Sequence, residues 1–144
     1  MLSMAPSPLL STPVVALNGR ADASCVTVPT VSFEIQPGVI YGVSTAISNN
    51  GNIIVNNTAT NADTQLGLGG SIPLAGTGFI TLNSFGTSGA RARIVAADPT
   101  YVLTQGPDHT IRGTGTVLSA FNNQGTIHAD RAEPMNLDGS TSLL

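Results

Sequence analysis

The chain has 144 residues, a length that suits one domain with a sizeable core rather than two. Only 9% of the residues are charged, all five basic residues are arginines, and the formal net charge is −3. Nucleic-acid binding is disfavoured because no basic stripe is available for phosphates. A hydrophobic content of 41% argues against a disordered polar chain, and small polar residues mixed with aliphatic ones favour short strands and tight turns.

Residues 1–30 are rich in Pro, Ser and Ala and predict a poorly ordered leader. The leader is apolar enough to fold over the first strands as a partial N-terminal cap. It lacks a positive n-region, and Pro8 and Pro13 interrupt its apolar segment, so it does not match a standard signal peptide. Cys25 is the only cysteine and cannot form an internal disulfide, so it is interpreted as a buried or incidental thiol.

From Val31 onward, brief apolar clusters alternate with Gly, Asn, Asp and Pro. Most of these clusters alternate apolar with small or polar residues, as half-buried strands do. The predicted strands span residues 31–35, 39–44, 52–56, 71–75, 78–83, 91–97, 100–104, 109–113, 115–120 and 125–130. No window keeps the helical spacing of apolar residues for three turns. The chain is therefore predicted to be all-β, without a long helix.

Two phrases of the sequence occur twice. "LAGTGFITL" (74–82) aligns with "IRGTGTVLS" (111–119) at an offset of 37 residues, which places Gly76 on Gly113 and Gly78 on Gly115. "NNGNI" (49–53) aligns with "NQGTI" (123–127) at an offset of 74. Self-similarity at a fixed spacing indicates a solenoid.

For short strands, that solenoid is a parallel β-helix of a few coils, predicted over residues 31–137 and followed by a C-terminal tail at 138–144. Each strand would stack on its equivalent in the next coil at about 4.8 Å. The glycines of the repeated phrases are predicted at corners that need positive φ; they are Gly51, Gly76, Gly78, Gly113, Gly115 and Gly125. The aliphatic residues predicted to point inward are Ile53, Ile80, Ile94, Ile111, Val117 and Ile127.

The run "HTIRGTGTV" followed by "NNQGTIHAD" resembles the repeat of bacterial autotransporter and filamentous-haemagglutinin-like surface or secreted proteins. In that family, His-Thr-Ile-x-Gly-x-Gly is followed by Asn-x-Gly-x-Ile through a right-handed parallel β-helix. The resemblance covers roughly residues 45–137 and is clearest at 109–130. Members of the family are usually longer and carry a membrane barrel or a sorting segment, so the chain resembles a passenger fragment or a small relative. The resemblance implies a structural or adhesive role and supplies no catalytic residues.

Candidate chemical groups are few. His109 and His128 fall within the repeated phrases, where a polar corner or an exposed strand position is the expected role. A metal site would need a third ligand at a defined spacing, which the sequence does not offer. Aspartates beside proline, glycine or strand ends are expected to support turns; they are Asp98, Asp108, Asp130 and Asp138. We therefore predict no catalytic, cofactor-binding or metal-ligating residue and no cofactor.

The leading hypothesis is a non-enzymatic structural or adhesive β-helical module of a bacterial surface or secreted protein. The expected partners are a cell-surface or carbohydrate ligand and a second copy or continuation of the β-helix, with neither nucleic acid nor a membrane span. One alternative is a polysaccharide-active lyase or hydrolase on the same scaffold, which a cleft with two or more close carboxylates plus an arginine would favour. The other is a trimeric virion-type fibre segment, in which coils would close only between chains.

Overall fold

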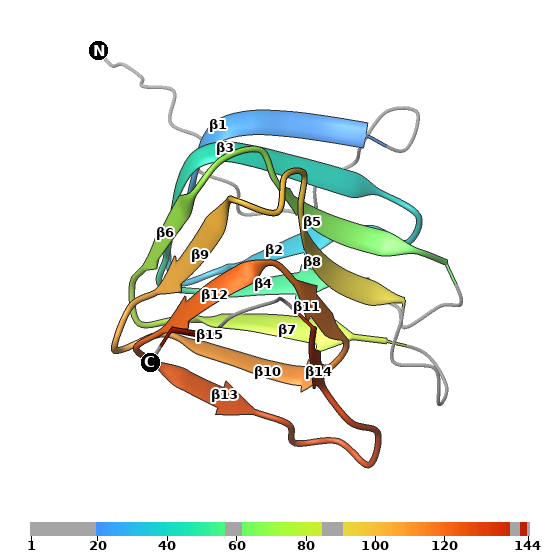
Figure 1. The fold of residues 1–144 in the computed structure, drawn as a ribbon. Coiled ribbons are helices and arrows are strands. Elements are labelled where there is room, and N and C mark those ends of the chain that lie inside the picture. The colour runs from blue at the N-terminus through green and yellow to red at the C-terminus, as the bar shows by residue number, and fades with distance from the viewer. Residues whose placement is uncertain (1–19, 57–61, 85–90, 139–141, 144) are drawn as a thin grey trace.

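The computed structural model describes residues 20–56, 62–84, 91–138 and 142–143. Within these ranges every regular element is a β-strand, and all of the strand pairings are parallel (Figure 1). The prediction of an all-β chain without a long helix is therefore confirmed for the described residues.

The strands are short, and all ten predicted segments contain one. They are β1 (Arg20–Val28), β2 (Ser32–Ile35), β3 (Ile40–Asn49), β4 (Asn52–Val55), β5 (Thr64–Leu68), β6 (Ile72–Ala75), β7 (Phe79–Asn83), β8 (Ala92–Ala96), β9 (Val102–Gln105), β10 (Thr110–Thr114), β11 (Thr116–Leu118), β12 (Ala120–Asn123), β13 (Thr126–His128), β14 (Asn136–Leu137) and β15 (Ser142–Leu143). The sequence pattern missed β1, β5, β12, β14 and β15.

The strands form two sheets that the chain visits repeatedly. Sheet A has five strands in the order β2-β4-β7-β10-β13. In the ten-stranded sheet, the first half of β3 pairs with β5 and its second half with β6. This splits the sheet into a first arm, β3-β5-β8-β11-β14, and a second arm, β3-β6-β9-β12-β15, with β1 alongside β3. The chain passes from sheet A to the first arm, the second arm and sheet A again, so its strands form stacked circuits around one core (Figure 1).

Apolar side chains in register fill the space between sheet A and the two arms of the ten-stranded sheet. In sheet A, Ile53 pairs with Phe33 and Ile80, and Ile111 pairs with Ile80 and Ile127. Ile53 is 1% exposed, and Ile80 and Ile111 are fully buried. Ile127 is partly buried and packs against the core. Each fully buried aliphatic side chain contributes about 1.5–3 kcal/mol, so the stack stabilises the circuits along their whole length.

The first arm carries a matching stack. Tyr41, Leu66, Ile94 and Val117 occupy one register position on successive strands, and all four are buried. At the N-terminal end, the Phe33 and Tyr41 rings meet edge to face with centroids 4.9 Å apart. Five of the six residues predicted to point inward are thus fully buried, and Ile127 is partly so.

The circuits differ in length, and this corrects one of the two repeat alignments. In sheet A, successive partners of Ile53 and Ile80 lie 27 and 31 residues apart, so an offset of 37 is not a structural register. Gly76 and Gly78 precede β7, whereas Gly113 lies in β10 and Gly115 follows it. The two GTG phrases therefore lie at opposite ends of the strands of sheet A. They look alike because the corners at both ends need residues without side chains.

The second alignment, at 74 residues, coincides with the structural register. Asn52 pairs with Phe79, Phe79 with Thr110, and Thr110 with Thr126, so Gly51 and Gly125 precede equivalent strands. A Cβ at Gly51 would overlap the carbonyl oxygen of Val31, and one at Gly125 that of His109. Of the six glycines, Gly76 and Gly113 have positive φ, at 107° and 99°; at the other four, close backbone approach excludes a side chain instead.

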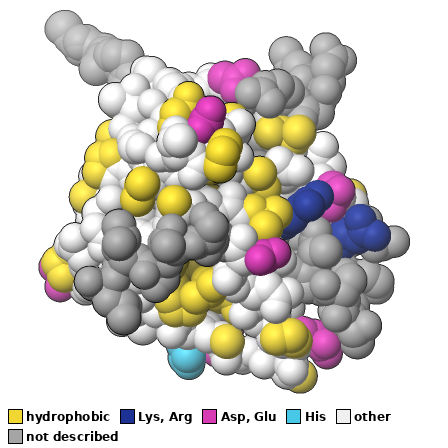
Figure 2. Space-filling model, in the orientation of Figure 1, with side chains coloured by type: hydrophobic (Ala, Val, Ile, Leu, Met, Phe, Trp, Pro, Cys, Tyr) yellow, Lys and Arg dark blue, Asp and Glu magenta, His cyan; other side chains and the backbone are white. Residues whose placement is uncertain are grey.

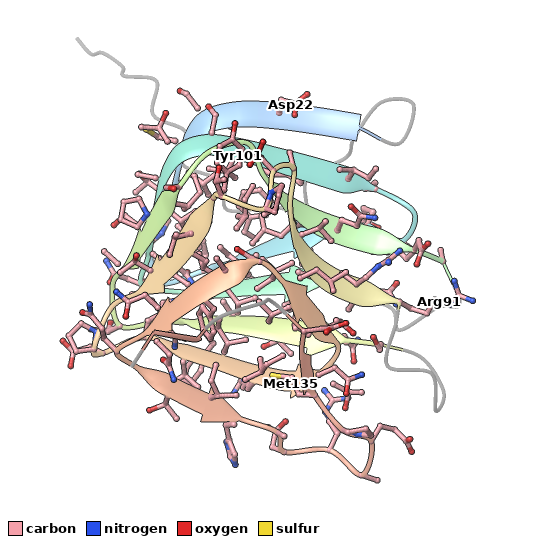
Figure 3. The ribbon with its side chains drawn as sticks, viewed as in Figure 1. Asp22, Arg91, Tyr101 and Met135 are labelled. Atoms are coloured by element: carbon pink, nitrogen blue, oxygen red, sulfur yellow. The ribbon has the colours of Figure 1, made fainter. Side chains whose placement is uncertain are left out.

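The ends of the predicted domain also differ from expectation. β1 begins at Arg20 and runs parallel to β3, so part of the predicted leader is a strand of the ten-stranded sheet; residues 1–19 lie outside the described residues. Within β1, Cys25 is exposed rather than buried. At the other end, β15 pairs with β12 inside the predicted tail. Figure 3 shows Asp22 on β1 and Met135 beside β14, at the two ends of the first arm's row.

Candidate functional site

The outer face of sheet A carries a polar surface with one exposed aromatic ring. Because Ile53, Ile80 and Ile111 point inward, the alternation of strand side chains turns their neighbours outward. The register then aligns Asn52, Phe79 and Thr110 in one outward row. The next outward row contains Glu34, Ile54, Thr81, Arg112 and His128.

A shallow groove of about 310 Å³ lies at the start of these strands. Residues 30–32 and 50–52, from the turns into β2 and β4 and the first residues of those strands, line it together with Phe79 and Arg112. Phe79 is 37% exposed, and Arg112 is the only charged residue in the lining. A basic group and an exposed ring thus share one polar groove.

Arg112 is held in place by two contacts with the neighbouring strand β7. Its guanidinium carbon lies 4.1 Å from the centroid of the Phe79 ring, a cation–π contact that contributes about 0.5–1 kcal/mol at an exposed site. Its Nε donates to Thr81 Oγ1 at 3.1 Å, and Thr81 Oγ1 donates in turn to Asn52 Oδ1 at 2.8 Å. This chain of hydrogen bonds crosses β10, β7 and β4 and fixes the orientation of all three side chains.

The same bonds leave donor groups facing the groove. Asn50 Oδ1 accepts from the Thr77 backbone N–H at 3.1 Å and the Thr77 hydroxyl at 3.4 Å. The amide oxygens of Asn50 and Asn52 are therefore occupied, and their NH₂ groups have no acceptor among the described residues. The same holds for the Nη groups of Arg112. The groove offers N–H donors and one positive charge.

A second polar network lies buried at the corner before sheet A. Asn49 Oδ1 accepts from the Gly51 N–H at 3.0 Å, while its Nδ2 donates to the Phe79 carbonyl at 2.8 Å and lies 2.9 Å from His109 Nε2. Asn123 Oδ1 accepts from the Gly125 N–H at 2.9 Å in the equivalent turn three circuits later. The repeated Asn-x-Gly phrase is thus a turn closed by its own asparagine side chain.

His109 is part of this buried corner. It is 1% exposed, so of the two predicted roles the polar corner is correct and the exposed position is wrong. Burial lowers the pKa of His109 from about 6.5 to about 4, so the ring is neutral at neutral pH. Because Nε2 accepts from Asn49, the ring proton is on Nδ1. Both Nδ1 and the nearby Gln105 Oε1 are buried without a hydrogen-bond partner among the described residues.

The structure does not bring the other predicted groups together. Asp98 closes a turn by accepting from the Thr100 hydroxyl at 2.6 Å and the Thr100 backbone N–H at 2.8 Å, and these bonds lower its pKa. Asp108 precedes β10, and Asp138 follows β14. Asp130 Oδ1 lies 4.0 Å from Arg131 Nε. His128 is exposed on β13. In the part of the chain that the structure describes, no three His, Cys, Asp or Glu residues gather as a metal-binding group.

An ion-pair cluster on the first arm also escaped the sequence analysis. Asp63 pairs with Arg93 at 2.8 Å and with Arg91 at 3.5 Å, before β5 and at the start of β8. Half-exposed pairs of this kind contribute about 0–1 kcal/mol each. The cluster pairs two of the five arginines with one carboxylate. Arg93 also lines a second groove, together with Asp138, whereas the lining of the Arg112 groove contains no carboxylate.

Comparison of the chain with protein-family models, characterised proteins and solved structures gave no significant match. Among the described residues, no helix is long and apolar enough to cross a membrane.

Proposed function

We propose that the chain is a non-enzymatic structural and adhesive module, folded as a right-handed parallel β-helix and belonging to a bacterial surface or secreted protein of the autotransporter or filamentous-haemagglutinin-like type. The observation that carries the proposal is the unbroken aliphatic stack through sheet A. Five parallel strands place Phe33, Ile53, Ile80, Ile111 and Ile127 in one register. A core continuous along the stacking direction makes a stiff rod, as in solenoid proteins.

The surface of the rod supports an adhesive role. Figure 2 shows a visible face that is largely uncharged, with arginine and acidic side chains confined to a few places. On sheet A the outward rows present the amide group of Asn52 and the hydroxyl group of Thr110. A flat array of such groups on a rigid support suits the recognition of hydroxyl-rich ligands, because little entropy is lost on ordering them.

The enzyme alternative is less well supported. A glycoside hydrolase needs two carboxyl groups about 5–9.5 Å apart across the scissile bond. The sheet A groove contains an arginine and no carboxylate in its lining. In the same row as Arg112, Glu34 is three strands away, roughly 14 Å at about 4.8 Å per strand.

The fibre alternative predicts circuits that close only between chains. In this structure each circuit takes sheet A and both arms from one chain, which favours a single-chain rod. β13, β14 and β15 each pair on one side only among the described residues, and Leu137 is 51% exposed. Unpaired strand edges are templates for another chain, so we propose that the module self-associates or continues its β-helix at this end. Light scattering over a concentration series tests this, and a strict monomer at high micromolar concentration would refute it.

The adhesive and non-enzymatic parts are tested in one experiment. Purified protein is retained on immobilised polysaccharides, and the eluate is assayed for reducing and unsaturated sugar ends. We expect retention without release of new ends, and we expect Asp108→Ala, His109→Ala and Asp130→Ala to change the melting temperature more than any turnover. Sustained release of sugar ends that is lost in one of these variants would establish the enzyme alternative instead.

A further inference from the structure

We propose that the sheet A groove is a binding site for acidic polysaccharides, in which Arg112 holds the carboxylate of a uronate residue. The inference rests on the proposed adhesive function and assigns it a ligand class and an anchor residue. The groove is defined by Asn50, Asn52, Phe79 and Arg112 with the turn before β2.

The guanidinium of Arg112 is preorganised. Stacking on Phe79 at 4.1 Å and donation from Nε to Thr81 fix the plane of Arg112 before any ligand arrives. Nη1 and Nη2 have no acceptor in the described parts of the chain, so the end of the guanidinium remains available. Two parallel N–H donors match the two oxygens of a carboxylate. A side chain that is already ordered loses less conformational entropy when it binds.

The hydrogen bonds around Arg112 leave N–H donors facing the groove. Both asparagine oxygens are occupied, by Thr77 at Asn50 and by Thr81 at Asn52. Each oxygen already accepts a hydrogen bond, so the amide N–H groups are the polar atoms of these two side chains that have no partner among the described residues. A ligand rich in acceptors and negatively charged satisfies these donors, whereas a cationic or donor-rich ligand does not. The nearest partner of Arg112 on β13 is His128, so no carboxylate adjoins it in the row on that side.

The position of the groove on sheet A favours a saccharide over an acidic peptide. Extended peptides bind sheets by adding a strand at an open edge. Asn52, Phe79 and Arg112 instead lie on β4, β7 and β10, each paired on both sides within sheet A, so no strand can be added beside them. The groove meets an edge strand only at residues 30–32, at the start of β2. The exposed part of Phe79 offers an apolar contact to the C–H groups of a pyranose ring, while the carboxylate and hydroxyl oxygens face the donors.

The test is calorimetric titration of the full chain with three probes of similar length: a hexameric oligogalacturonate, maltohexaose as the neutral sugar, and hexaglutamate as the acidic peptide. We expect oligogalacturonate to bind at least about tenfold more tightly than either of the others, and to weaken as salt is raised. Arg112→Gln should reduce its affinity at least about tenfold, and Arg112→Lys should also lose affinity because the two-pronged fork is lost.

Arg131→Gln is the matched control. It removes the same charge from a side chain that bonds Asn83 and lies outside the groove, so it should leave binding within about twofold. Equal losses in the Arg112→Gln and Arg131→Gln variants would overturn the proposal and indicate attraction by net charge alone. Equal binding of hexaglutamate would also overturn it. Retention on neutral polysaccharides without measurable binding of oligogalacturonate would refute this site but keep the adhesive function, whereas retention on no polysaccharide would refute both.

Discussion

Two polar networks lie next to each other at the start of sheet A. One is buried and the other faces the solvent. The buried corner is centred on Asn49, whose three contacts are all inside the protein. The open groove is centred on Asn52, whose oxygen is used and whose amide faces outward. Asn49 ends β3 and Asn52 begins β4, three residues apart across one turn. The difference arises because the Asn49 side chain is fully buried, whereas Asn52 is only half-buried at the start of sheet A. Buried polar groups determine stability, and exposed ones with spare donors are available for recognition.

The largest expected effect is from Asn49→Ala. It leaves the Gly51 N–H, the Phe79 carbonyl and His109 Nε2 without their side-chain partner. A buried group left unsatisfied costs about 1–3 kcal/mol, so the free energy of unfolding should fall by about 3 kcal/mol or more. Denaturant unfolding measures it.

Asn52→Ala is the matched control for that change. It removes the same amide from a half-buried position, and water can replace the lost bond to Thr81. We expect a loss below about 1 kcal/mol. Similar losses in the two variants would show that the two networks do not differ in the way the structure indicates.

Protonation of His109 tests the buried corner without a change of residue. Its pKa in the folded protein is about 4, below the unfolded value near 6.5, so the unfolded chain binds the proton first as the pH falls. The contribution of neutral His109 to the free energy of unfolding is fully present above about pH 6.5 and is lost progressively between about pH 6.5 and 4. The full shift corresponds to about 3 kcal/mol.

His109→Gln isolates this term, because the variant removes only the His109 imidazole and keeps every other ionisable side chain. The difference between the stability–pH curves of the wild type and the variant should therefore slope only between about pH 6.5 and 4. Parallel curves through this window would contradict the assignment of a neutral, buried His109.

The sequence predicted the elements of this fold better than their alignment. Alternation identified the strands that contain Ile53, Ile80 and Ile111, because each of these buried residues has at least one polar neighbour in the sequence. It missed β5, where Gly67 interrupts the apolar pattern, and β1, whose residues are mixed with those of the leader. Strand patterns depend on local burial, which the sequence shows directly.

The sheet A groove forms only when its strands pair in the correct register. The repeated phrases of the sequence did not predict that register. Arg112 reaches Phe79 and Thr81 because β10 is displaced by 31 residues from β7, whereas β7 is displaced by 27 from β4. Unequal circuits hide the spacing, and the GTG phrases suggested 37 because glycine is required at two different corners. The available signal was the pair of outward residues beside each buried isoleucine, in "FIT" (79–81) and "TIR" (110–112).

The smallest expected effect on stability is from Thr81→Val, which keeps the shape of the side chain and removes the hydroxyl between Arg112 and Asn52. We expect the free energy of unfolding to fall by about 1 kcal/mol or less, since the two partners are half-buried and reach water. Oligogalacturonate affinity should nevertheless fall severalfold, because the guanidinium loses the contact that fixes its plane. Thr110→Val makes the same change on the same face with no side-chain bond to Arg112, and it should leave the affinity unchanged. If both variants bind like the wild type, the hydrogen-bond chain does not position Arg112, and the recognition depends on its charge and on Phe79 alone.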